Sequence, residues 1–149
     1  MPKNRRSRML VTSLGGLCML IGAPAMAANL HAVLQGSKEF TGGDPDGWAR
    51  VKINIDDSAN RLCADVETRS LEKVTGIHVY RGMPGDKSSP VISLEIPKGD
   101  NDSDDCDKIG DELADQIQAS PSDFYVSVRT IDHPNGALAG KIMPGKYKG

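Results

Sequence analysis

The stretch ARVKINIDDSANRLCADV, residues 49–66, contains the pattern that decides the fold. Apolar residues stand at every second position in two runs: Ala49, Val51, Ile53 and Ile55, then Leu62, Ala64 and Val66. This period of two is that of a β-strand with one buried face. Turn-forming residues occupy positions 57–60 between the runs. The stretch therefore predicts two strands joined in a hairpin.

The same alternation recurs along most of the chain, in residues 30–34, 77–79, 92–96, 124–128 and 138–143. One segment departs from it, because Ile109, Leu113 and Ile117 recur every four residues, which predicts a short amphipathic helix. No strand–helix–strand alternation is present. We therefore expect an all-β fold, an antiparallel Greek-key-like β-sandwich of about seven strands with one short helix before the penultimate strand.

The first 27 residues have the three parts of a secretory signal peptide. A basic start precedes an apolar run from Met9 to Ile21, and Ala25-Met26-Ala27 matches a signal-peptidase site. The apolar run is shorter than the about 20 residues of a spanning helix. We expect residues 1–27 to be removed and residues 28–149 to form one domain, periplasmic or secreted, with no membrane insertion after cleavage.

The net charge of the expected domain limits its partners, and its cysteines suggest a covalent link. The predicted signal removes four of the 18 Lys and Arg residues and none of the 20 acidic residues, leaving a net charge of about −6. Nucleic acid is therefore not an expected partner. Cys63 and Cys106 remain, and a pair of cysteines in an oxidising compartment favours a disulfide. Two free thiols or a pair of metal ligands are the alternatives.

The acidic segment GDNDSDDCDKIGDE, residues 99–112, is the strongest run of charge. Asp100, Asp102 and Asp104 have the spacing of the first ligands in an EF-hand calcium loop. However, the loop lacks the glycine and the bidentate glutamate at later positions. We interpret the segment as a solvated acidic loop next to Cys106, with a calcium site as the alternative.

The stretch GIHVYRGMPGD, residues 76–86, places His78 and Tyr80 on one face of a predicted strand. A mononuclear copper or zinc site is conceivable from His31, His78 and an acidic residue, since both metals accept imidazole. A surface or hydrogen-bonded role is the ordinary one for a single strand histidine. No esterase, metalloprotease or phosphate-loop motif is present, and we predict no catalytic residues.

Two blocks of sequence resemble the CHRD (chordin-type) family, which also occurs as single-domain secreted bacterial proteins. HVYRGMPGDKSSPVISL (residues 78–94) is similar to a segment that reads His-x-His, Arg-Gly, a turn, Gly-Pro-Val and a strand. PSDFYVSVRTIDHPNGALAGKI (residues 121–142) is similar to the closing segment, with Tyr-Val-x-Val, His-Thr and a proline-glycine turn. The resemblance spans nearly all of residues 30–143 and implies a β-sandwich.

The departures from the family pattern concern its polar residues. Tyr80 replaces the second histidine of His-x-His, and Arg129 replaces the histidine before threonine. Arg129 is expected on the same face as Tyr125 and can stack on Tyr80 or donate to a carboxylate, but a guanidinium does not ligate metal. GIHVY also resembles the copper-ligand strand of copper-zinc superoxide dismutases. Three histidines cannot supply the six that their site requires.

We therefore predict an exported CHRD-domain protein that acts as a non-enzymatic binding or structural module without a cofactor. Its partner is an unknown protein or another extracellular ligand. The alternative is a metal-binding protein, with copper or zinc on the histidines or calcium on the acidic segment. The residues of the candidate binding surface are His78, Tyr80, Arg81, Arg129 and His133.

Overall fold

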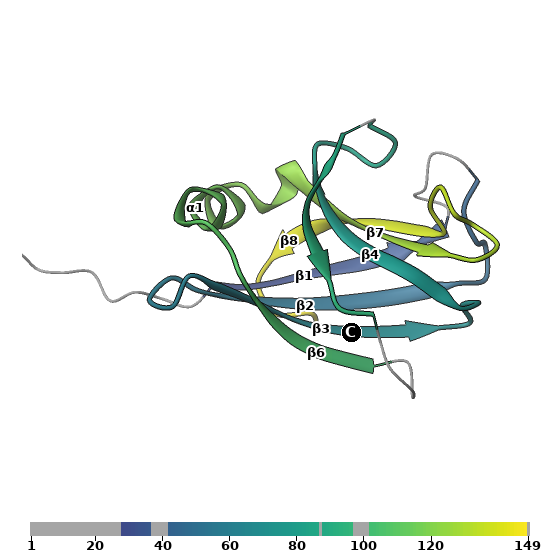
Figure 1. Ribbon diagram of the computed structural model, residues 1–149, viewed down its shortest axis with the longest axis horizontal. Coiled ribbons are helices and arrows are strands. Elements are labelled where there is room, and N and C mark those ends of the chain that lie inside the picture. Colours follow the sequence, from purple (N-terminus) through teal and green to yellow (C-terminus); the bar gives the residue numbers. More distant parts are fainter. Residues whose placement is uncertain (1–27, 37–41, 87, 97–101, 149) are drawn as a thin grey trace, which may run out of the picture.

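The computed structural model describes residues 28–36, 42–86, 88–96 and 102–148. The strands there, shown in Figure 1, are β1 (Ala28–Gln35), β2 (Trp48–Asp56), β3 (Arg61–Arg69), β4 (Val74–Arg81), β5 (Pro90–Leu94), β6 (Asp102–Lys108), β7 (Phe124–Thr130) and β8 (Leu138–Pro144). Helix α1 (Asp111–Ala119) and a 3-10 turn (Pro121–Asp123) precede β7. The all-β class and the helix before the penultimate strand are therefore confirmed. The predicted signal peptide lies outside the described residues.

The eight strands form one sheet in the order β5-β4-β7-β8-β1-β2-β3-β6, and every pair is antiparallel. Two separate sheets do not form, because β1 is hydrogen-bonded to β8 on one side and to β2 on the other. The sheet instead curls until its halves face each other, almost as a barrel (Figure 1). Residues of β5 and of the β6–α1 junction line one pocket of about 300 Å³, so the two free edges approach each other there.

The inward face of the curled sheet forms the hydrophobic core. Every second residue of β2 and β3 is buried, as the alternation of residues 49–66 predicts. Helix α1 adds Ala114 and Ile117 to the same core at one end of the sheet (Figure 1). Each fully buried large aliphatic side chain stabilises the fold by about 1.5–3 kcal/mol. None of the described helices is long and apolar enough to cross a membrane.

The hairpin between β2 and β3 is stabilised by local hydrogen bonds. One carboxylate oxygen of Asp56 accepts from the backbone N–H of Ser58 (3.0 Å) and from its hydroxyl (2.6 Å). The hydroxyl bond is the main reason why the pKa of Asp56 is lowered. Asn60 has φ of 51°, a conformation that asparagine tolerates better than most residues. The predicted hairpin is confirmed, and the turn residues explain its position.

The interpretation of residues 99–112 as a loop is wrong for part of the segment. Asp102–Lys108 forms the edge strand β6, which pairs with β3 along its whole length. The register places Cys106 directly opposite Cys63, and the two form the predicted disulfide. The sequence DSDDCDK has no apolar alternation, so periodicity could not reveal this strand. Backbone pairing and the disulfide hold it in the sheet.

Candidate functional site

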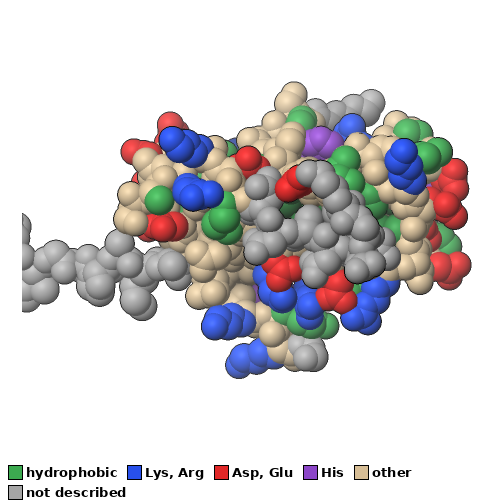
Figure 2. Space-filling model, turned by 60° about the horizontal axis from the view of Figure 1, so that its bottom comes forward, with side chains coloured by type: hydrophobic (Ala, Val, Ile, Leu, Met, Phe, Trp, Pro, Cys, Tyr) green, Lys and Arg blue, Asp and Glu red, His purple; other side chains and the backbone are tan. Residues whose placement is uncertain are grey.

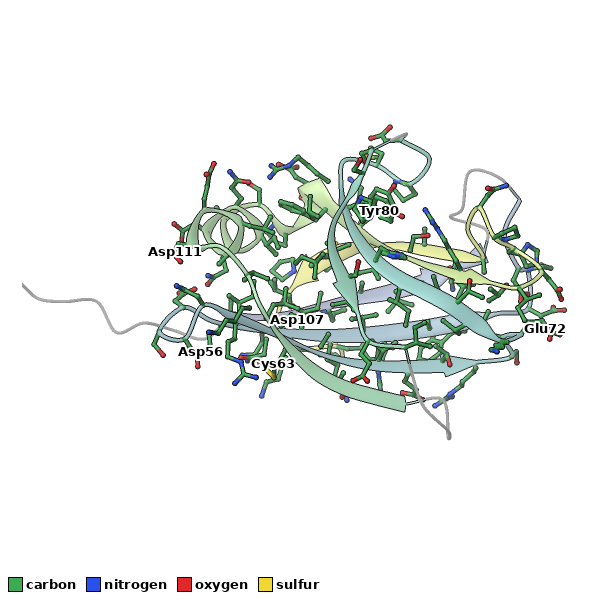
Figure 3. The ribbon with its side chains drawn as sticks, viewed as in Figure 1. Asp56, Cys63, Glu72, Tyr80, Asp107 and Asp111 are labelled. Atoms are coloured by element: carbon green, nitrogen blue, oxygen red, sulfur yellow. A yellow bond between two sulfur atoms is a disulfide. The ribbon has the colours of Figure 1, made fainter. Side chains whose placement is uncertain are left out.

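The outer face of β4 and β7 contains what we call the aromatic–arginine patch, made of His78, Tyr80, Tyr125 and Arg129. The strand register sets Tyr80 opposite Tyr125 and places Arg129 opposite Gly76. The intervening residues of both strands point to the core, because side chains alternate along a strand. The pairing of β4 with β7 therefore places core residues on the inner face of the sheet and the patch on its outer face. Figure 3 labels Tyr80 near the end of β4.

The two tyrosines make the patch rigid. Their rings stack with centroids 5.1 Å apart and planes 13° from parallel. Only 5% of Tyr80 and 4% of Tyr125 is exposed, and Ala139 of β8 packs with them. Arg129 donates from Nη2 to the hydroxyl oxygen of Tyr80 at 2.7 Å. The tyrosine pair therefore orients the guanidinium, and stacking of this kind adds about 0.5–1.5 kcal/mol beyond the buried area.

His78 lies beside this arrangement, with its ring centroid 6.1 Å from that of Tyr80. The ring sits over Gly76, where an added Cβ would come within 2.6 Å of Cε1. Burial, and then the positive charge of Arg129, lower the pKa of His78. The imidazole is therefore neutral at neutral pH. Its Nδ1 is buried and has no hydrogen-bond partner.

Among the described residues, the hydrogen-bond partner of the Arg129 guanidinium is neutral. The guanidinium is half-buried, and no ion pair among the described residues includes it. A guanidinium has five N–H donors in a planar fork that fits a carboxylate or a phosphate. Taking such a charge partly out of water is costly unless an anion pairs with it. The patch is therefore chemically suited to accept an anionic group.

Two residues of the predicted binding surface lie elsewhere. Arg81 turns toward α1, where it donates to the side-chain oxygen of Gln116 and lies over the ring of Phe124, 4.8 Å from the centroid. His133 belongs to the turn between β7 and β8, where its backbone N–H donates to the hydroxyl of Thr130. The structure therefore brings together His78, Tyr80 and Arg129, and it does not bring Arg81 or His133 to them.

The histidines proposed as metal ligands are not brought together either. His31 lies on β1, which β7 and β8 separate from the strand that carries His78. Within the described ranges, no group of three or more His, Cys, Asp or Glu side chains is arranged to hold a metal ion. Asp100 lies outside the described residues, and Asp102 and Asp104 belong to β6.

Sequence reasoning missed a second outer surface, on β1, β2 and β3. Arg50 pairs with Glu67, Lys52 with Asp65, and Arg69 also with Glu67. Figure 2 shows Lys and Arg side chains next to Asp and Glu side chains on the lower part of its view, below the grey atoms. The sequence signal for this surface was the set of polar residues that alternate with the apolar ones in β2 and β3. Their pairing depends on strand register, which the pattern alone does not give.

These features define an antiparallel β domain with a filled interior, which presents polar and aromatic groups on its outer faces. The family model described as "CHRD domain" matches residues 30–142, which is most of the chain. The chain therefore belongs to the CHRD-domain family. The search of curated proteins and the search of solved structures found no match.

Proposed function

We propose that this protein is an exported, non-enzymatic binding module that recognises an anionic group of an extracellular partner through the aromatic–arginine patch. The observation that carries the proposal is the half-buried guanidinium of Arg129, whose hydrogen-bond partner among the described residues is the hydroxyl of Tyr80. A carboxylate or phosphate of the partner would offset the cost of desolvating this charge. The family and the disulfide agree with a role outside the cytoplasm.

The composition of the patch supports binding better than catalysis. Its tyrosines are stacked and buried, and its arginine is a permanent cation. The buried tyrosines hold the guanidinium in place, and arginine side chains contribute much of the binding energy at interfaces. For the metal-binding alternative, β7 and β8 lie between the strands of His31 and His78, and the calcium alternative rests on Asp100 and on the side chains of Asp102 and Asp104, which lie outside the described part of the structure.

His78 provides a direct test, because an anion on Arg129 would offset the charge that disfavours protonation of the imidazole. We expect acetate and inorganic phosphate to shift the NMR resonance of His78 and to raise its pKa. The resonance of His133, in the turn between β7 and β8, serves as the internal control. Proton uptake and anion binding are linked reciprocally, so anion affinity should increase as the pH falls through the pKa of His78.

Two substitutions separate specific binding from general charge effects. Arg129→Gln removes the guanidinium, whereas Arg81→Gln removes an equal charge at the end of the neighbouring strand β4, where it contacts α1 instead of the patch. We expect only the first to abolish the response of His78 to anions. If His78 titrates identically with and without both anions, or responds equally in Arg129→Gln, the proposed recognition is wrong.

A further inference from the structure

The chain that follows β8 crosses the outer face of the sheet on the other half of the molecule. Gly145, with φ of +86°, turns the backbone; its N–H donates to the carbonyl of Asn29 (2.8 Å), and its carbonyl accepts from Nδ1 of His31 (2.9 Å). Beyond this anchor, the ring of Tyr147 lies 5.8 Å from the ring of His31 and 5.4 Å from the guanidinium carbon of Arg50. We call residues 145–148 the crossing segment.

The crossing segment forms one wall of a pocket of about 440 Å³, a volume within the range of small-molecule sites. Outward residues of β2 form the floor, Asn29 of β1 and Cys63 of β3 lie to either side, and Lys146 and Tyr147 form the wall. This pocket lies on other strands than the aromatic–arginine patch. A ligand here would not depend on the function proposed for that patch.

Positive charge predominates in the pocket. Arg50, Lys52 and Lys146 line it, against the single carboxylate of Asp65. Asp65 is paired with Lys52, and Arg50 is paired with Glu67, which lies outside the lining. Lys146 forms no ion pair within the described part of the chain. A ligand with one negative charge would therefore complete the electrostatic pairing.

The hydrogen-bonding groups of the pocket lining further limit the class of ligand that the pocket fits. The side chains of Asn29 and Asn54 each offer donors and an acceptor, and the carboxylate of Asp65 only accepts. Chloride or sulfate has no donor for these acceptors, whereas a hydroxylated ligand has several. The ring of Tyr147, 36% exposed, provides an apolar surface for the C–H groups of such a ligand.

We propose that this pocket binds a small polyhydroxylated acid of the uronic-acid type. Its carboxylate would lie near Lys146, its hydroxyl groups would exchange hydrogen bonds with Asn29, Asn54 and Asp65, and its ring would lie against Tyr147.

The test uses the full exported chain and three probes at equal ionic strength: sodium glucuronate, glucose and sodium acetate. Two-dimensional NMR follows the side-chain amides of Asn29 and Asn54 and the backbone amides of Lys146 and Tyr147. We expect glucuronate to bind about tenfold more tightly than either glucose, which lacks the charge, or acetate, which lacks the hydroxyl groups; this factor corresponds to about 1.4 kcal/mol.

The control variant lies on the same segment. Lys146→Gln should weaken glucuronate binding about tenfold, which corresponds to about 1.4 kcal/mol, and leave glucose unchanged. Lys148→Gln removes an equal charge from a residue that does not line the pocket, and it should leave both affinities unchanged. Unchanged amide positions elsewhere in the spectrum confirm that both variants fold.

Three results would overturn the proposal. The pocket amides fail to respond to glucuronate; acetate binds as tightly as glucuronate, so that only an adventitious anion is held; or Lys148→Gln weakens glucuronate as much as Lys146→Gln does. The last result would mean that the net charge of the segment acts at long range and that no pocket contact is made.

Discussion

Removal of the disulfide between Cys63 and Cys106 should destabilise the protein by a predictable amount. The two cysteines are 43 residues apart in sequence, and the link restricts the unfolded chain. In the chain-entropy treatment, closing a loop of this length contributes about 4 kcal/mol at 25 °C. The double variant Cys63→Ala/Cys106→Ala should therefore lose up to about 4 kcal/mol in the free energy of unfolding.

The position of the disulfide also predicts where the structure opens first. β6 is an edge strand, and its described side chains, those of residues 106–108, are not part of the core cluster. The register sets Asp104 opposite Asp65, and acidic residues at opposed positions disfavour pairing. Without the covalent link, the described contacts that hold β6 to β3 are the backbone ladder and the hydrogen bond from Arg61 to the carbonyl oxygen of Cys106. We therefore expect the amides of residues 102–108 to exchange faster in the double variant, through openings smaller than global unfolding.

Urea denaturation at pH 7 measures the first effect, and amide hydrogen exchange measures the second. Wild-type protein reduced with a thiol reagent serves as the control, because it loses the bond but keeps both cysteine side chains. A loss below about 1 kcal/mol, together with unchanged exchange in β6, would refute the view that the disulfide constrains the unfolded chain and retains the strand.

Three further predictions concern other parts of the chain. Gly140→Ala should lower the free energy of unfolding by about 1–3 kcal/mol, measured by thermal or urea unfolding, because a Cβ there would lie 2.1 Å from the carbonyl oxygen of Val33. Gly110→Ala should lower it by less than about 1 kcal/mol, because nothing lies within 4 Å of the added Cβ. Equal losses in the two variants would count against this reasoning. The pKa of His78 is lowered in the folded state, so the unfolded chain binds more protons below about pH 6.5, and stability should rise with pH from that lowered pKa up to about 6.5. His78→Gln should remove this slope, and an unchanged slope would assign it to other groups. Mass spectrometry of protein exported from a bacterial host should give a chain that begins at Ala28, and an uncleaved mass would contradict the predicted signal peptide.

The elements that could be predicted from the sequence are those whose residue pattern directly reflects which side chains are buried. Alternation located β2 and β3 because each apolar residue there is buried by the same face of the sheet. The period of four located α1 for the same reason, since Leu113 and Ile117 lie on one side of the helix. Both patterns reflect which side chains are buried, and this can be read from one segment of the chain alone.

The parts that sequence did not supply depend on how segments meet. β6 has no apolar alternation, so only its pairing partner and Cys106 explain why it is a strand. The contact between Arg129 and Tyr80 could be anticipated, because both lie on the polar faces of strands expected to be neighbours. The pocket beside Tyr147 could not be anticipated from the sequence, since its lining comes from three strands and the crossing segment.

The curled sheet separates the residues of β4 and β7 that build the core from those that form the aromatic–arginine patch. Ile77, Val79, Val126 and Val128 point inward and are buried in the core cluster, whereas Tyr80 and Arg129 alternate with them on the outer face. A change at an outward position leaves the core packing intact, because successive side chains of a strand project to opposite faces. Outer-face residues such as Tyr80 and Arg129, which are hydrogen-bonded to each other, can therefore vary without disturbing the core. The inward positions are occupied by core side chains, so the two surfaces proposed for binding are built from outward positions and from the chain that crosses them.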